Sequence, residues 1–109
     1  MTDQTKLKAL EALLAKVVAG RATIPDFIAS KNIVPGWHFS TALLAYNGSL
    51  DAAMKLHEAV LSGWEWCCGD TCTTLYDGEL LIDGSFDDNP ARAWLIVTIR
   101  ALIAEDQAK

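Results

Sequence analysis

Apolar residues in the first part of the chain recur at intervals that match one face of an α-helix. The intervals are three and four residues, and the positions are Leu7, Leu10, Leu14 and Val17. Asp3 and Thr5 precede them as candidate N-caps, and Gly20 follows them at a place where glycine commonly ends a helix. This spacing predicts a helix of about four turns.

Two shorter helices are expected in the next part of the sequence. Pro25 suits the first turn of a helix, where the backbone needs no amide hydrogen, and that helix should end near Asn32. Pro35 and Gly36 then interrupt the chain. A second short helix should follow and end before residues 47–48, with these apolar positions: Trp37, Phe39, Leu43, Leu44 and Tyr46.

Two segments carry clear helix signals on either side of residues 63–83. Ser49 is a candidate N-cap for a helix at residues 50–62, in which apolar positions repeat with helical period. Asn89 and Pro90, preceded by two aspartates, are typical of another helix start. The helix that follows is apolar almost all round, so we expect it to be buried and to lie across the core.

Residues 63–83 alternate between apolar and polar positions, which is typical of β-strands. Gly69 with Asp70, and Asp77 with Gly78, suit two-residue hairpin turns, and two turns predict three strands. The resulting register sets the following residues opposite one another: Trp64 and Leu75, Trp66 and Thr73, Cys67 and Cys72, Leu75 and Leu80, and Thr73 and Ile82.

This register gives the sheet two different faces. The apolar face holds Trp64, Trp66, Cys68, Thr73, Leu75, Leu80 and Ile82. The mostly polar face holds Glu65, Cys67, Cys72, Thr74, Tyr76, Glu79, Leu81 and Asp83. An antiparallel sheet with one apolar face needs helices against it. We therefore predict a single α+β domain over residues 1–109, in which a three-stranded antiparallel β-meander at about residues 63–83 packs with N-terminal helices and a buried C-terminal helix.

Composition and charge narrow the function. The 109 residues are 51% hydrophobic and 21% charged, which is ordinary for one folded domain. No run of about 18 apolar residues and no signal-peptide pattern is present, so we expect a cytoplasmic protein without a membrane segment. The net charge of −5 argues against direct binding to nucleic acid, because phosphates repel an acidic protein.

Half of the 14 acidic residues fall in one stretch that contains no lysine or arginine. They are Glu65, Asp70, Asp77, Glu79, Asp83, Asp87 and Asp88. A dense carboxylate face of this kind favours docking on a partner with a basic surface. The candidate contacts are Glu65, Asp77, Glu79 and Asp83. The other interpretation is a solvated sheet face together with ordinary turn and cap residues.

Trp37 is a further candidate contact, because it lies in the turn-bearing segment IVPGWHF, beside His38 and Phe39. An exposed loop tryptophan is a common anchor for a partner or for another subunit. The alternative is that this irregular segment packs over the core and buries the indole. The sequence leaves both interpretations open.

Three cysteines lie within six residues, at Cys67, Cys68 and Cys72. A closed zinc site needs four ligands, and this stretch offers neither a second cysteine pair nor a nearby histidine, so no metal site is predicted. Cys67 and Cys72 form a candidate redox pair, since they lie opposite each other in the predicted register, and the alternative is two free thiols. Catalysis by cysteine with His38 or His57 lacks the basic surroundings that a thiolate needs. No phosphate-binding loop or hydrolase motif is present either, so we predict no enzyme activity and no cofactor.

Two segments resemble a known group of proteins. They are SLDAAMKLHEAVLSGWEW at residues 49–66 and NPARAWLIVTIRALIAE at residues 89–105. The capped helix, the G-W-x-W entry into a short sheet and the closing helix that begins Pro-Ala-x-Ala are similar to small phage and prophage proteins described as the phage α-β-α sandwich domain. The segment KNIVPGWHFSTALLAYNG departs from that pattern. The resemblance implies an accessory protein of a phage or prophage, with no catalytic residues to transfer to this chain.

These observations lead to three hypotheses. The first is a non-enzymatic phage or prophage accessory protein that binds a host or phage macromolecule through the acidic face, inside the host cell, for host takeover or for counter-defence of the anti-CRISPR kind. The second is a phage structural or assembly protein that forms a homo-oligomer. The third is a small-ligand or metal-binding enzyme.

Overall fold

The structure, a computed structural model, describes residues 3–31, 33–61, 63–68, 72–77, 80–86 and 89–107. Within these residues the elements follow one another as α1 (Asp3–Val18), α2 (Ile24–Ala29), α3 (Phe39–Tyr46), α4 (Leu50–Val60), β1 (Glu65–Cys68), β2 (Cys72–Asp77), β3 (Leu80–Phe86) and α5 (Pro90–Gln107). The longest helix, α5, has 18 residues, and the longest strand, β3, has 7. The described chain is therefore predominantly helical.

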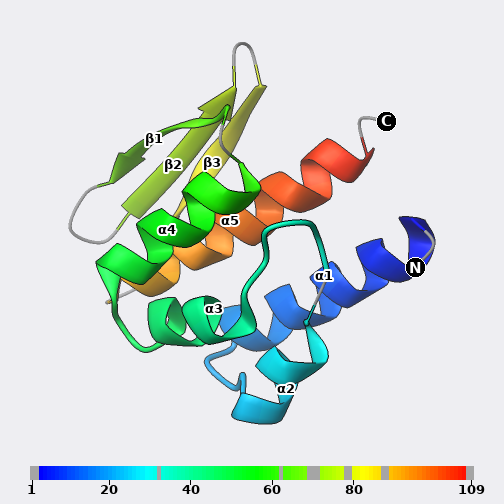
Figure 1. Cartoon of the computed structure of the whole chain (residues 1–109). Coiled ribbons are helices and arrows are strands. Elements are labelled where there is room, and N and C mark those ends of the chain that lie inside the picture. The colour runs from blue at the N-terminus through cyan, green and yellow to red at the C-terminus, as the bar shows by residue number, and fades with distance from the viewer. Residues whose placement is uncertain are drawn as a thin grey trace.

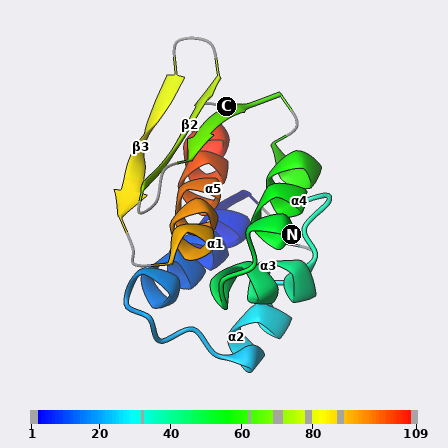
Figure 2. The same ribbon diagram turned by 90° about the vertical axis from the view of Figure 1, so that its left-hand side faces the viewer.

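The central element of the fold is α5 (Figure 1). It contacts the helices α1, α3 and α4 and, on another side, the strands β2 and β3. Figure 2 shows the same arrangement after a quarter turn, with the strands on one side of α5 and α4 on the other. The short helix α2 packs on α3, farther from the sheet. One helix thus joins the helical part of the molecule to the sheet.

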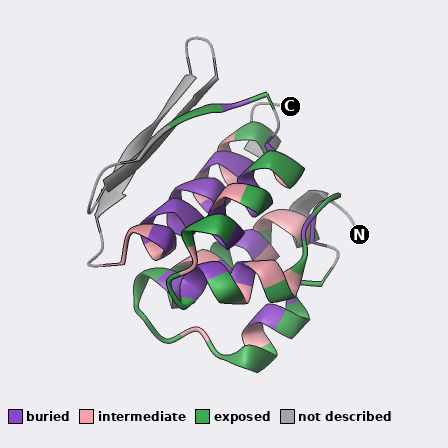
Figure 3. Cartoon of the chain, turned by 60° about the vertical axis from the view of Figure 1, so that its left-hand side comes forward, coloured by how far each residue is buried: buried purple, intermediate pink, exposed green. Residues whose placement is uncertain are grey.

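The sequence of α5 explains its central position. Its buried apolar side chains point in every direction around the helix, and they are Ala91, Ala93, Trp94, Leu95, Ile96, Val97, Ile99, Ala101 and Leu102. Thr98 is also buried, but its hydroxyl donates to the carbonyl oxygen of Trp94 at 2.8 Å and so brings no unpaired group into the core. The predicted buried C-terminal helix is confirmed, and Figure 3 shows burial along much of its length.

Side-chain caps begin α4 and α5 where the sequence predicts helix starts. The Ser49 hydroxyl accepts the backbone N–H of Ala52 at 3.2 Å. The side-chain oxygen of Asn89 accepts the N–H groups of Ala91 and Arg92 at 3.1 and 3.2 Å. These bonds satisfy amide groups that the first turn of a helix leaves without an acceptor.

Arg92 and Tyr46 connect the beginning of α5 to the end of α3. The Arg92 Nε–H donates to the carbonyl oxygen of Tyr46 at 3.1 Å, and the guanidinium carbon lies 4.1 Å from the centroid of the Tyr46 ring. The same ring contacts Phe27 of α2, with centroids 5.5 Å apart. One tyrosine therefore links three helices by a hydrogen bond, a cation–π contact and an aromatic contact.

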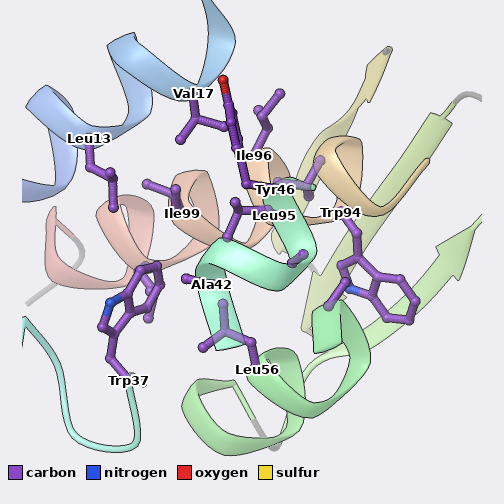
Figure 4. Close-up of a cluster of buried hydrophobic side chains, with 14 of the residues drawn as sticks. Leu13, Val17, Trp37, Ala42, Tyr46, Leu56, Trp94, Leu95, Ile96 and Ile99 are labelled. Atoms are coloured by element: carbon purple, nitrogen blue, oxygen red, sulfur yellow. The ribbon is translucent and has the colours of Figure 1, made fainter. Parts of the chain in front are cut away.

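The hydrophobic core lies among α1, α3, α4 and α5 (Figure 4). The residues labelled there are Leu13, Val17, Trp37, Ala42, Tyr46, Leu56, Trp94, Leu95, Ile96 and Ile99. Buried loop residues complete this core, namely Ile33, Val34, Leu61 and Trp64. Exposure is described for two strand residues, Glu65 and Trp66, and neither of them is buried.

The predicted α+β fold, built on a three-stranded antiparallel β-meander at about residues 63–83, is wrong. The described molecule is predominantly helical, and most residues of its described core come from the helices. The strands pair in the order β1-β2-β3, but over residues 65–86, in another register, and at the side of α5. The prediction placed the sheet at the centre of the fold, whereas α5 takes that place, because a helix that is apolar all round is buried on every side.

The strand register also differs from the predicted one. Trp66 pairs with Leu75 rather than with Thr73, and Leu75 pairs with Ile82 rather than with Leu80. The second connection falls between the paired residues Asp77 and Leu80, one position later than predicted, so the β2–β3 neighbours change. The β1–β2 neighbours change because Cys68 pairs with Thr73, which makes the first connection longer than predicted. An irregularity between Thr73 and Leu75 shifts the register again. The predicted turn residues Gly69, Asp70 and Gly78 lie outside the described residues.

The α-β-α sandwich implied by the resemblance is not present in the described structure. A sandwich of that kind places helices on both faces of the sheet. In Figures 1 and 2 the described helices lie on one side of the strands, and α5 is the one that contacts β2 and β3. No described helix covers the other face.

Candidate functional site

The acidic candidates are distributed along the sheet. Glu65 is exposed at the first position of β1 and pairs with Tyr76, the neighbour of Asp77 at the end of β2. Glu65 and Asp77 therefore occupy the same end of the sheet, and Asp83 lies farther along β3. For Asp77 and Asp83 the structure describes the backbone position alone, and Glu79 lies outside the described residues, as do Asp70, Asp87 and Asp88.

The two tryptophans at the start of this segment differ from their predicted positions. Trp66 is 42% exposed rather than part of the core, although its ring lies against Trp94, with centroids 4.7 Å apart. Trp64 is buried, as expected, but it precedes β1 instead of belonging to a strand. Its indole N–H donates to Glu105 at 3.4 Å.

Trp37 is not an exposed anchor. Its side chain is 4% exposed, and its Nε1–H donates to the hydroxyl of Ser30 at 2.9 Å. Ser30 donates in turn to the carbonyl oxygen of Phe27 at 2.5 Å. The segment around Trp37 packs over the core, which is the alternative that the sequence leaves open, so Trp37 is removed from the candidate contacts.

His57 is a structural residue at the end of α4. It is buried, as is Trp94, whose ring meets the imidazole edge to face with centroids 6.0 Å apart. His57 Nε2 lies 2.9 Å from the carbonyl oxygen of Trp64, and because a carbonyl can only accept, Nε2 carries the hydrogen. Nδ1 of His57 and Nε1 of Trp94 have no hydrogen-bond partner in the described structure. The bond to Trp64 fixes the chain where it passes from α4 into β1.

The backbone register separates the candidate redox pair. Cys67 pairs with Thr74 and Cys72 pairs with Phe86, so the two cysteines are not opposite each other as predicted. The predicted register was wrong because it assumed a two-residue first turn, and the redox pair itself stays a prediction. Within the described ranges there is no group of three histidine, cysteine or acidic side chains that could hold a metal ion.

A pocket that the sequence analysis did not predict lies between α1 and α2. Its volume is about 190 Å³, and it is lined by Ala9, Ala12, Leu13, Lys16, Asp26, Ala29, Ser30 and Ile33. An ion pair lies among these residues, with Lys16 Nζ 2.7 Å from Asp26 Oδ1. The two partners are ten residues apart and come together only when α2 folds back on α1.

Hydrogen bonds hold the Asp26 carboxylate in place. Its Oδ2 accepts the backbone N–H and the hydroxyl of Thr23, each at 2.8 Å, at the start of α2. The hydrogen bond from Lys16 and those from Thr23 lower the pKa of Asp26 from 3.8 to about 2. Asp26 is therefore a fixed anion across the neutral range, and it positions the Lys16 ammonium. The Thr-x-x-Asp spacing at residues 23–26 was the one sequence signal for this arrangement.

A second hollow adjoins this pocket. It has a volume of about 400 Å³ and is lined by Lys6, Ile33, Val34, Pro35, Gly36, Trp37 and His38. Ile33 belongs to both linings, so the two hollows follow α1 side by side. The second is the wider and the more polar of the two.

In comparisons with known proteins, no family model, no curated protein and no solved structure matches this chain. In the described ranges, no helix combines the length and the apolar character that crossing a membrane requires.

Proposed function

We propose that this chain is a non-enzymatic binding protein that docks on a basic surface of a partner macromolecule through the strands from Glu65 to Phe86. The observation that carries the proposal is the exposed start of β1, where Glu65 and, at the next position, the half-exposed ring of Trp66 both reach solvent. Aromatic side chains are enriched in protein interfaces, and polar groups form the rim around them.

Charge supports the same surface. Residues 65–88 contain seven carboxylates and no lysine or arginine, so no cation of this segment compensates them. Uncompensated charge of one sign attracts an opposite surface over a distance of about 10 Å at moderate salt. Such attraction mainly raises the rate of association and should weaken as salt increases.

The proposed setting is a phage or a prophage in its host cell. It rests on the resemblance of residues 49–66 and 89–105 to small phage proteins, and it fits an accessory protein that acts on a host or phage macromolecule in host takeover or counter-defence. We propose a protein partner, because a surface of this charge would repel the phosphates of DNA or RNA. The proposed location is the host cytoplasm.

The experiment is capture of partners from host lysate with the tagged protein at low and at moderate salt. The test variant is Glu65→Lys with Asp83→Lys, and the matched control is Glu11→Lys with Glu58→Lys, which changes the net charge equally at exposed positions on α1 and α4. We expect one partner to bind the native protein and the control, less at higher salt, and not the test variant. Equal recovery with both variants would remove the acidic surface from the proposal.

A second candidate function, a structural protein that assembles with itself, is favoured by exposed apolar side chains on the helices. They are Val18, Ile24, Ile28, Leu44 and Leu50. Ile24 and Ile28 are one turn apart on α2 and present a continuous apolar strip. Light scattering over a range of protein concentrations tests this function, because a mass that stays monomeric throughout excludes self-assembly in that range.

A further inference from the structure

The pocket between α1 and α2 combines an apolar interior with one positioned cation. Methyl and larger apolar groups form its walls, from Ala9, Ala12, Leu13, Ala29 and Ile33. The Lys16 ammonium is held at this pocket by the Asp26 carboxylate, 2.7 Å away. The side chain of Lys16 is 54% exposed and that of Asp26 is 18% exposed, so the lysine is the partner that a molecule arriving from solvent reaches first.

The volume of the pocket limits the size of its occupant. Sites for drug-sized ligands and cofactors measure about 300–1,000 Å³, and this pocket measures about 190 Å³. Since one water molecule takes about 30 Å³ of liquid, the pocket accepts a group of roughly six non-hydrogen atoms. A nucleotide or a flavin would not fit, whereas a short alkyl chain or a single leucine-sized side chain would.

The cation determines the charge of the occupant. A lysine ammonium has three N–H donors, and the bond to Asp26 uses one of them. The other donors can hold an anion without breaking the ion pair. Because Thr23 fixes Asp26 and Asp26 fixes Lys16, little side-chain freedom is lost when an anion binds.

We propose that this pocket is a binding site for a carboxylate carried on a short apolar chain, with the chain among the alanines and the carboxylate on Lys16. The site is separate from the acidic strands and does not rest on the function proposed above. Two sources offer this chemistry: a free short-chain carboxylic acid, and the C-terminal end of a peptide whose last side chain is apolar.

The indole N–H of Trp37 provides an NMR signal that is sensitive to binding in the pocket. Its indole N–H donates to Ser30, and Ser30 lines the pocket. A molecule that displaces the Ser30 hydroxyl slightly should therefore shift the indole N–H resonance of Trp37. The variant Trp37→Phe identifies that resonance, because among the indole signals of the four tryptophans only the Trp37 signal disappears in this variant.

The test is a titration of the full chain, labelled with nitrogen-15, with hexanoate and separately with hexylamine, followed by NMR. We expect hexanoate to shift the amide signals of Ala9, Ala12 and Ala29 saturably in the millimolar range, together with the Trp37 indole. Hexylamine should bind at least about tenfold more weakly, because its charge repels Lys16. Lys16→Met should lower the affinity for hexanoate by about tenfold, whereas Lys16→Arg, which keeps the charge, should retain most of the affinity.

A pair of alanine variants separates the pocket from the rest of α1. Ala12→Leu fills the pocket and should abolish the shifts, whereas Ala15→Leu adds the same side chain at an exposed position outside the lining and should leave them unchanged. Absence of saturable shifts, equal affinity for hexylamine, or unchanged binding by Lys16→Met would each overturn the proposal. N-acetyl-leucine, titrated alongside, distinguishes the sources: tighter binding than hexanoate indicates a peptide end, and weaker binding indicates a free acid.

Discussion

Residues 1–31, which hold five cationic and three acidic side chains, and the segment from Glu65 to Asp88 are regions of opposite net charge in one small molecule. Five of the nine cationic residues lie before residue 32, namely Lys6, Lys8, Lys16, Arg21 and Lys31, whereas residues 65–88 contain none. The net charge of −5 therefore describes neither region. Each region favours ligands of the opposite charge, so binding at one should be nearly independent of binding at the other.

The two regions also differ in how their side chains are held. In the helical part, buried polar groups are mostly bonded, as in the chain from Trp37 to Ser30 to Phe27. At the start of β1, about two fifths of the Trp66 surface is exposed to solvent, and its ring contacts Trp94 of α5. This difference leads us to expect that the helices contribute more to stability than the start of β1 does, and substitutions matched across the two regions test that expectation.

The largest effect is expected at Trp94. Replacement by alanine removes from α5 a ring that is 2% exposed, and it should lower the free energy of unfolding by about 3–5 kcal/mol. Trp66→Ala, which removes the same ring from an exposed position, should lower it by less than about 2 kcal/mol. Urea unfolding measures both. Equal losses would mean that the sheet belongs to the core as fully as the helices do.

A smaller effect is expected at Gly36, in the loop that covers the helical core. Its φ is +86°, and a β-carbon there would lie 2.5 Å from the carbonyl oxygen of Ala59 in α4. Gly36→Ala should therefore cost more than about 2 kcal/mol in thermal or urea unfolding. Gly20→Ala is the control, because Gly20 also has a positive φ but no atom within 4 Å, and it should cost about 1 kcal/mol.

His57 tests the connection between the two regions. His57→Leu preserves the volume but leaves the carbonyl oxygen of Trp64 without its donor, and stability should fall by about 1–3 kcal/mol. His38→Leu, at an exposed position, should change stability by less than about 0.5 kcal/mol. A result in which both variants unfold at the same urea concentration would show that the His57 bond contributes nothing to stability.

The smallest effect concerns the pH dependence of the helical region. The pKa of Asp26 is lowered to about 2 in the folded chain from 3.8, so its ion pair stabilises the fold above pH 3.8 and this contribution is lost as the pH falls toward 2. Asp26→Asn should therefore be slightly less stable than the native protein at pH 6, and the difference should shrink steadily between pH 4 and pH 2. A constant difference over that range would contradict the assignment.

Much of the helical part could be predicted from the sequence. Ser49 and Asn89 indicate the starts of α4 and α5, because local cap chemistry decides where a helix begins. The uniform apolar character of α5 predicts its burial without knowledge of its neighbours. These features depend on residues close together in the chain.

The remaining features depend on contacts that the sequence does not display. The strand register follows from where each turn falls, and one position of error at the second turn moves Leu75 from Ile82 to Leu80. The alternation of apolar and polar residues predicted that Trp66 is buried, but its ring is partly exposed. How much of a sheet face a helix covers depends on tertiary packing, which the alternation does not reveal. The pocket requires Lys16 and Asp26 to meet across the loop between α1 and α2, which no local pattern specifies.

The central place of α5 has a consequence for the order in which the protein is made. Three helices, α1, α3 and α4, pack on α5, which lies at residues 90–107. They therefore leave the ribosome before the surface that completes their burial exists. Until then their apolar faces are open to chaperones and proteases. We therefore expect the helical core to complete its folding only after α5 has been translated. A change that slows the docking of α5 should lower the yield of the protein in the cell more than it lowers the stability of the folded protein.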